Sequence, residues 1–121
     1  MKLAPYILLS ETAFGINNEN YDGIATTFSG NAVRGASHYY QTKDQQTFSW
    51  QLNNFVGYLI IEATLETDPA TPNYFEVANI GDGITAITES TSLNVIGNFT
   101  WVRVSVVNFA SGTITEVAVT Y

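Results

Sequence analysis

The only histidine of the chain, His38, is the first residue to consider for catalysis. Imidazole is the side chain that most often serves as a general base or a metal ligand near neutral pH. No neighbouring residue completes a catalytic or zinc-binding group, and we find no nucleophile elbow or phosphate-binding glycine loop. The chain has no cysteine, so it has neither thiolate chemistry nor disulfide bonds. We therefore interpret His38 as structural and predict that the protein is not an enzyme.

The segment Asn18–Gly23 resembles the opening of a calcium-binding loop. Oxygen-bearing side chains occupy alternate positions, and glycine stands sixth. The twelfth position of such a loop needs a bidentate carboxylate, and here it is Ser29. We interpret the segment as a solvated turn and predict neither a metal nor a cofactor.

Four carboxylates lie close together in the sequence, and two of them could serve as a general acid and a general base. No spacing singles out a pair, so we interpret them as a solvent-facing group. They are Glu62, Glu66, Asp68 and Glu76.

The aromatic residues and Arg103 admit a binding function. An exposed tryptophan on a sheet can stack on a sugar ring, but Trp50 and Trp101 both stand within alternating apolar segments, which is typical of residues in the core or at its edge. Arg103 lies between Val102 and Val104 on an expected central strand. A charge in that position must pair with a carboxylate or contact a partner surface.

The elements that would position these residues are strands. Apolar residues alternate with polar ones around Trp50, and the same period of two recurs further on. Asn53 and Asn54 suit the turn of a central β-hairpin, because asparagine tolerates positive φ. The predicted core residues are Phe48, Trp50, Leu52, Leu59, Ile61, Val102 and Val104, with Ala63 and Leu65 on the same face.

The remaining segments are short and are separated by Gly, Asn and Pro. Further strands are expected at Ile84–Glu89 and Ser92–Ile96, a β-prone stretch at His38–Thr42, and a last turn at Asn108–Gly112. Three Asn-Phe pairs, which begin at residues 54, 98 and 108, are expected to share a turn geometry. No segment has helical periodicity over three turns. The sequence predicts one all-β domain over residues 1–121, an antiparallel, jelly-roll-like β-sandwich with almost no helix.

Residues 1–10 are expected to form either an N-terminal arm or an edge strand. Tyr6, Ile7, Leu8 and Leu9 are four successive large side chains, whereas a half-buried strand needs only every second one to be apolar. Pro5 limits pairing within a sheet. We predict that these four residues, together with Arg103, contact a second subunit or a larger assembly.

Composition argues against two classes of partner. The formal charge is −7, and only four side chains are cationic, so the chain should repel the phosphates of a nucleic acid. Its longest apolar run is far shorter than the ~20 residues that span a bilayer, and no export signal is recognisable. We predict binding neither to nucleic acid nor to membrane.

Two blocks of the sequence resemble a family of small virion structural proteins of tailed phages, especially phages of cyanobacteria and marine bacteria. They span residues 39–121, about two thirds of the chain, and residues 1–38 lie outside the resemblance. The first block comprises Tyr39-Tyr40, Phe48-Ser49-Trp50, Asn54–Leu65 and Asp68-Pro69; the second comprises Gly97–Val104, Asn108-Phe109 and Gly112-Thr113-Ile114.

The resemblance implies a non-enzymatic β-sandwich that assembles on a phage particle. A capsid decoration, or cement, protein fits best: a homotrimer bound to the major capsid protein on the capsid surface of the virion, made in the host cytoplasm. Two alternatives stay open. One is a module associated with the tail, baseplate or fibre, and the other is a carbohydrate-binding module.

Overall fold

The computed structural model describes residues 5–39 and 44–121, and nearly all of its regular structure is β-strand. Among these residues, all strand pairs are antiparallel and the one helix has four residues, so the predicted all-β antiparallel class is confirmed. The elements are β1 (Tyr6–Leu9), β2 (Thr12–Ala13), β3 (Phe28–Ser29), β4 (Val33–Arg34), α1 (Ala36–Tyr39), β5 (Gln45–Thr64), β6 (Phe75–Ile80), β7 (Ile87–Ile96) and β8 (Trp101–Thr120).

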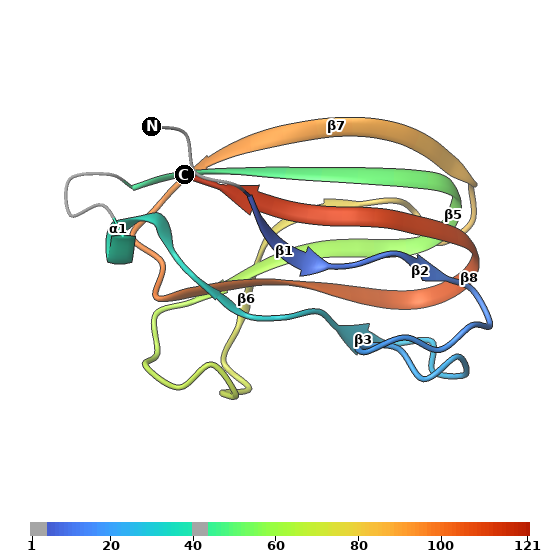
Figure 1. The fold of residues 1–121 in the computed structure, drawn as a ribbon, viewed down its shortest axis with the longest axis horizontal. Coiled ribbons are helices and arrows are strands. Elements are labelled where there is room, and N and C mark those ends of the chain that lie inside the picture. Colours follow the sequence, from blue (N-terminus) through green and yellow to red (C-terminus); the bar gives the residue numbers. More distant parts are fainter. Residues whose placement is uncertain (1–4, 40–43) are drawn as a thin grey trace.

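Two long strands, β5 and β8, form the centre of the fold (Figure 1). Each has 20 residues, and they pair from Thr47 opposite Thr120 to Thr64 opposite Trp101. β7, β1 and β2 flank one half of this pair, while β6, β3 and β4 flank the other half. Both long strands bend midway, so the single sheet folds over into two layers around one core.

The bends lie where the sequence predicted turns, and those two predictions were wrong. Asn54 and Asn108 do adopt positive φ, 53° and 54°. The two halves of each strand do not pair with each other as in a hairpin; instead, each strand bends over from one layer to the other and pairs with the other long strand on both sides of the bend. The register between β5 and β8 shifts at both places, as at a β-bulge. A hairpin and a bulge both need a residue that tolerates positive φ, so the residue type alone does not distinguish them.

The bends place Phe55 and Phe109 at the middle of the core. Both rings are buried, with their centroids 5.7 Å apart. The geometry expected for the Asn-Phe pairs is thus shared by Asn54-Phe55 and Asn108-Phe109, whereas Asn98 has no positive φ.

The predicted core is confirmed, because all seven residues named for it are at most 6% exposed. Inward positions on β5 are even-numbered up to Leu52 and odd-numbered from Phe55, since the bulge adds one residue and inverts the alternation. Leu65 was expected on the buried face but is 67% exposed, because β5 ends at Thr64.

The two halves of the chain repeat the same order of elements. β1 and β2 pair with the second half of β8, a loop with Asp22-Gly23-Ile24 follows, and β3 and β4 pair with the first half of β8. Likewise, β6 pairs with the second half of β5, a loop with Asp82-Gly83-Ile84 follows, and β7 pairs with the first half of β5. The domain therefore has an internal two-fold arrangement in which each half builds on the long strand of the other.

Two other local predictions differ from the structure. The two short strands expected after residue 83 are one continuous strand, β7. His38 and Tyr39, expected in a β-prone stretch, belong to the helical turn α1, and residues 40–43 of that stretch lie outside the described residues.

Residues 6–9 form an edge strand, the second of the two predicted alternatives. β1 pairs with the end of β8, and Leu8 and Leu9 are fully buried in the core of this chain. The predicted contact of these two leucines with another subunit is therefore wrong. A bulge between Ile7 and Leu9 turns both side chains inward, where residues of the same chain cover them. Ile7 remains 37% exposed, and residues 1–4 lie outside the described part.

Candidate interaction site

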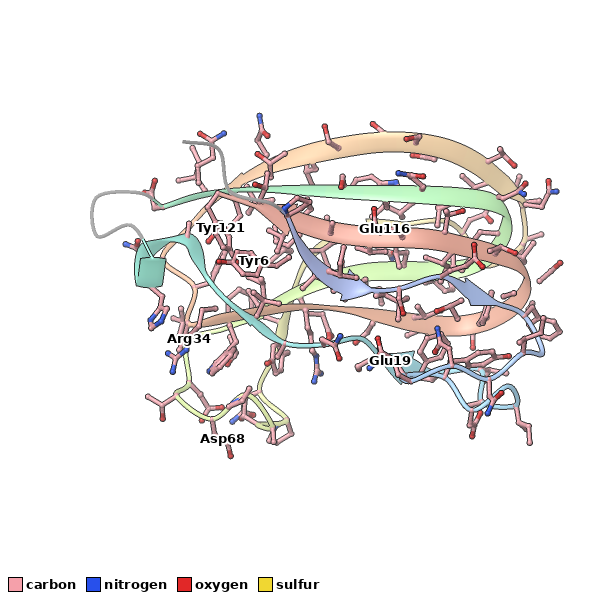
Figure 2. All side chains as sticks on the ribbon, viewed as in Figure 1. Tyr6, Glu19, Arg34, Asp68, Glu116 and Tyr121 are labelled. Carbon is pink, nitrogen blue, oxygen red and sulfur yellow. The ribbon has the colours of Figure 1, made fainter. Side chains whose placement is uncertain are left out.

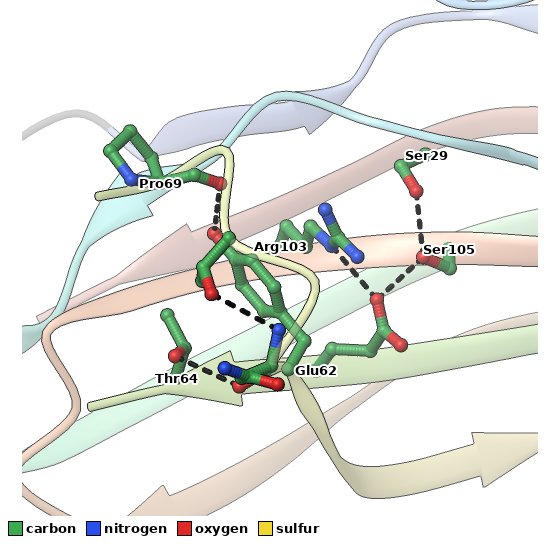
Figure 3. A network of polar contacts seen from close by, with 9 residues as sticks. Ser29, Glu62, Thr64, Pro69, Arg103 and Ser105 are labelled. Carbon is green, nitrogen blue, oxygen red and sulfur yellow. Dashed lines mark hydrogen bonds and ion pairs between the residues drawn. The ribbon is translucent and has the colours of Figure 1, made fainter. Parts of the chain in front are cut away.

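Arg103 lies in the best-defined polar network of the described structure (Figure 3). Its Nε lies 2.9 Å from Oε1 of Glu62, and its guanidinium stacks on the ring of Tyr74 at 3.7 Å from the centroid. The Ser105 hydroxyl donates to the same Glu62 oxygen at 2.6 Å and lies 2.9 Å from the hydroxyl of Ser29. The expected pairing of Arg103 with a carboxylate is confirmed, and its charge is neutralised within the chain.

The surroundings of this network indicate a structural role. Tyr74 donates its hydroxyl proton to the Pro69 carbonyl at 2.9 Å, and burial raises the pKa of this phenol. The network therefore ties the loop of residues 65–74 to the outer face of β5 and β8.

Two other carboxylates of the expected group bind residues of their own loop. Glu66 accepts a hydrogen bond from the Thr71 hydroxyl, and the Thr71 and Asn73 side chains lower the pKa of Glu66. Asp68 accepts a hydrogen bond from the backbone N–H of Ala70 at 2.9 Å. Glu76 is opposite Glu62 in the register of β5 and β6.

The calcium-like segment binds its own backbone. Asn18 Oδ1 accepts the N–H groups of Asn20 and Tyr21, both at 3.1 Å, and Asp22 Oδ1 accepts those of Ile24 and Ala25. Across the part of the chain that the structure describes, no three His, Asp or Glu residues are grouped as metal ligands. The described residues also contain no helix long and apolar enough to cross a membrane.

Neither tryptophan forms an open platform for a sugar. Trp50 is 6% exposed and donates Nε1–H to Glu89 at 3.0 Å. Trp101 donates to the Thr67 carbonyl at 3.0 Å and carries the Arg34 guanidinium over its ring at 4.3 Å. His38 is exposed on α1.

Four exposed large apolar residues lie on the two loops at the bends of β5 and β8. We call Phe14, Ile16, Ile24 and Ile84 the bend surface; they are 48%, 64%, 86% and 84% exposed. Three come from the loop between β2 and β3, where the Phe14 ring packs edge-on against Phe109. The fourth comes from the loop between β6 and β7, at the same end of the sheet (Figure 1).

Two matching turns hold the isoleucines of the bend surface in place. Asp22 Oδ1 accepts the N–H groups of Ile24 and Ala25 at 2.8 and 2.7 Å, and Asp82 Oδ1 accepts those of Ile84 and Thr85 at the same distances. The glycine after each aspartate has positive φ, 88° and 78°. These backbone hydrogen bonds lower the pKa of both aspartates. Each isoleucine is thus exposed by an ordered turn.

Charge is unevenly distributed around the bend surface. Asp22 and Asp82 stand two residues before its isoleucines, and Glu19 lies on the same loop as Ile24 (Figure 2). The two described cations lie elsewhere, with Arg34 over Trp101 and Arg103 against Tyr74. The bend surface is therefore apolar with an acidic surround.

Sequence reasoning missed the bend surface. The signal was present, because Asp-Gly-Ile occurs twice, at 22–24 and 82–84. Aspartate followed by glycine indicates a turn, and a large apolar residue directly after that turn has no neighbour in sequence to cover it.

Comparison of the chain with models of known protein families and with curated protein sequences finds no match.

Proposed function

We propose that this protein is a non-enzymatic structural component of a phage virion, a decoration protein that binds the major capsid protein on the head shell. The observation that carries the proposal is the bend surface, on which Ile24 and Ile84 are more than four-fifths exposed on two matching, ordered turns. Isoleucine in water loses the stabilisation of about 1.5–3 kcal/mol that burial provides, so ordered exposure favours a surface that a partner covers.

The resemblance of residues 39–121 supports the choice of a virion partner, and the polar networks support a non-catalytic role. A capsid lattice with pockets for the two isoleucines would bind both at once, and linked contacts strengthen binding. In the same proposal, three copies form a homotrimer only when they bind the capsid lattice.

The test is binding of the purified protein to heads that lack it, prepared from the phage that carries the gene. We expect the native chain to decorate these heads and the Ile24→Asp/Ile84→Asp variant to lose binding at least tenfold. Leu65→Asp is the matched control, because Leu65 is 67% exposed and follows the last residue of β5, whereas the bend lies at the middle of that strand. Electron microscopy gives the location of the bound protein. Binding only to tails, or no loss in the double variant, would contradict the proposal.

A further inference from the structure

The outermost strand β7 presents a free edge. Its ten residues pair with β5 on one side, and Figure 1 shows it at the border of the folded sheet. No strand among residues 5–39 and 44–121 pairs with its other side. In an antiparallel strand, every second residue then directs its backbone N–H and C=O away from the sheet. This edge could accept another strand.

The other described edges are protected in ways that β7 is not. β1 has four residues and follows Pro5, β3 and β4 have two residues each, and β6 has six with a bulge opposite Glu62. The Asn31 N–H also donates to the Leu8 carbonyl at 2.7 Å, which closes the seam between β1 and the segment after β3. Natural sheets protect edges with charge, proline, bulges or short strands. β7 is long and contains neither proline nor a cation.

The inward row of β7 is only partly covered by its own chain. Leu93 is opposite Phe48 in register but stays 38% exposed, and Thr91, opposite Trp50, is exposed as well. The only charged residue on the strand, Glu89, accepts the hydrogen bond from Trp50. The edge is therefore neutral apart from one carboxylate with a partner inside the domain.

We infer that β7 pairs with β7 of a second copy of this chain, antiparallel about a two-fold axis at Thr91. With this axis perpendicular to the sheet, each side chain stays on its own face. Each residue then pairs with the residue of the other copy that lies equally far from Thr91 on the opposite side. Leu93 then faces Glu89, and Val95 faces Ile87. In the outward row, Ser90 faces Ser92. No two carboxylates are opposite each other, and Val95 and Ile87 each gain an apolar cross-strand neighbour.

A second copy fits this edge because the strand is self-complementary in that register. Two-fold pairing also occupies the β7 edge of both copies, so this contact cannot extend into a fibre. One strand pair buries less than the ~1,200–2,000 Å² of a stable interface, so the dimer is weak and depends on concentration. Each copy carries a charge of −7, so added salt strengthens the dimer by screening repulsion.

The first experiment measures mass by sedimentation equilibrium over a dilution series at low and high salt. We expect the mass to rise from 13.2 kDa toward twice that value, and more steeply at high salt. Ser90→Lys/Ser92→Lys places lysines opposite lysines across the axis, and Ser90→Glu/Ser92→Glu places glutamates opposite glutamates. Each variant alone should be monomeric, and a mixture should dimerise because lysine then faces glutamate. Asn79→Lys on β6 is the control and should dimerise like the native chain.

The second experiment captures the dimer covalently. The chain has no cysteine, so Thr91→Cys introduces the only thiol, and the axis places it opposite its own copy. Paired antiparallel residues have Cα separations of about 4.5–5.5 Å, which lie within the range that a disulfide spans. We expect Thr91→Cys to form the disulfide dimer at least tenfold faster than Asn79→Cys.

Three results would overturn the inference: a native mass that stays monomeric at every concentration and salt, no recovery of dimer in the Lys/Glu mixture, or equal oxidation of the two cysteine variants. Because this pairing is independent of the bend surface, its failure leaves the proposed binding to phage heads unaffected, and the reverse also holds.

Discussion

At the scale of single residues, Arg103 shows how one charge stabilises an outer sheet face. Its guanidinium joins three elements: Glu62 on β5, its own strand β8, and Tyr74 before β6. Both charged side chains are about four-fifths buried, at 22% and 18% exposed. We predict that Arg103→Ala lowers the free energy of unfolding by about 1–3 kcal/mol, less than a fully buried pair costs, as measured by urea denaturation. Arg103→Lys should recover only part, because lysine lacks the flat group that stacks on Tyr74.

A double-mutant cycle with Glu62→Gln isolates the ion pair from the stacking. If the pair contributes, Arg103→Ala costs less in the Glu62→Gln background than in the native chain. Equal losses in both backgrounds would assign the whole effect of Arg103 to its contact with Tyr74.

Trp50 combines a core side chain with a single polar contact. It is 6% exposed, and Nε1 donates to Glu89 on β7. Trp50→Ala should lower the free energy of unfolding by about 3–5 kcal/mol, because a large aromatic leaves a cavity. Trp50→Phe keeps most of the volume but loses the hydrogen bond, so about 1–2 kcal/mol is expected. A loss below about 1 kcal/mol for the alanine variant, measured in denaturant melts, would mean that the indole is not part of the core.

At the scale of elements, the bends of β5 and β8 are held by close backbone contacts. Gly112 has a φ of 88°, and a Cβ there would stand 2.1 Å from the carbonyl oxygen of Asn54. Gly15 has a φ of 83°, but a Cβ there meets nothing within 4 Å. Both positions require positive φ, and only one is crowded, so the pair separates the two costs.

We predict that Gly15→Ala lowers the free energy of unfolding by about 1–2 kcal/mol, the cost of positive φ for alanine. Gly112→Ala should cost about 1–3 kcal/mol more, because the Asn54 carbonyl must move and the bend with it. Thermal unfolding followed by circular dichroism provides the comparison. Equal losses in the free energy of unfolding for Gly15→Ala and Gly112→Ala would show that the Asn54 carbonyl moves at little cost.

The edge strand β1 gives a second element-level prediction. Leu8 and Leu9 are fully buried, whereas Ile7 is 37% exposed. Leu8→Ala should lower the free energy of unfolding by about 2–5 kcal/mol, and Ile7→Ala by clearly less, in urea denaturation. Removing residues 1–9 takes out both buried leucines and should unfold the domain. A truncated chain that stays folded but loses its assembly would instead support the arm that the sequence also allowed.

Strand positions and core faces could be predicted from sequence, because alternation at period two depends only on which side of a strand is buried. Phe48, Trp50 and Leu52 needed no further information. Whether the chain forms a hairpin turn or a bulge at Asn54 could not be predicted, because both need a residue with positive φ. The choice depends on Gly57 and Gly112, which lie against Asn108 and Asn54 respectively, on the opposite long strand. The network of Arg103 was predicted only as far as its need for a partner, since Glu62 is 41 residues away in sequence.

At the scale of the whole molecule, the internal two-fold arrangement gives the domain two equivalent aspartate-capped turns. The two turns come from opposite halves of the chain and lie at the same end of the folded sheet (Figure 1), the end at which the rings of Phe55 and Phe109 contact each other with centroids 5.7 Å apart. Both depend on an ionised carboxylate that accepts two backbone N–H groups. The shape of the bend surface is therefore coupled to pH through Asp22 and Asp82.

The backbone hydrogen bonds hold the pKa of Asp22 and Asp82 below the usual value of 3.8. The unfolded chain therefore protonates these two carboxylates at higher pH than the folded chain does. The stability from both turns is fully present above the unfolded pKa of 3.8 and is lost as the pH falls through the lowered pKa values of the folded chain. Asp22→Asn/Asp82→Asn keeps an acceptor oxygen at each turn but cannot be protonated there. We predict that its free energy of unfolding falls less than that of the native chain between about pH 5 and pH 2, in urea denaturation at each pH. Glu11→Gln/Asp44→Asn removes the same net charge elsewhere and is the control for general charge repulsion. If the free energy of unfolding falls with pH equally in the native chain and in the Asp22→Asn/Asp82→Asn variant, protonation of the two aspartates does not destabilise the turns.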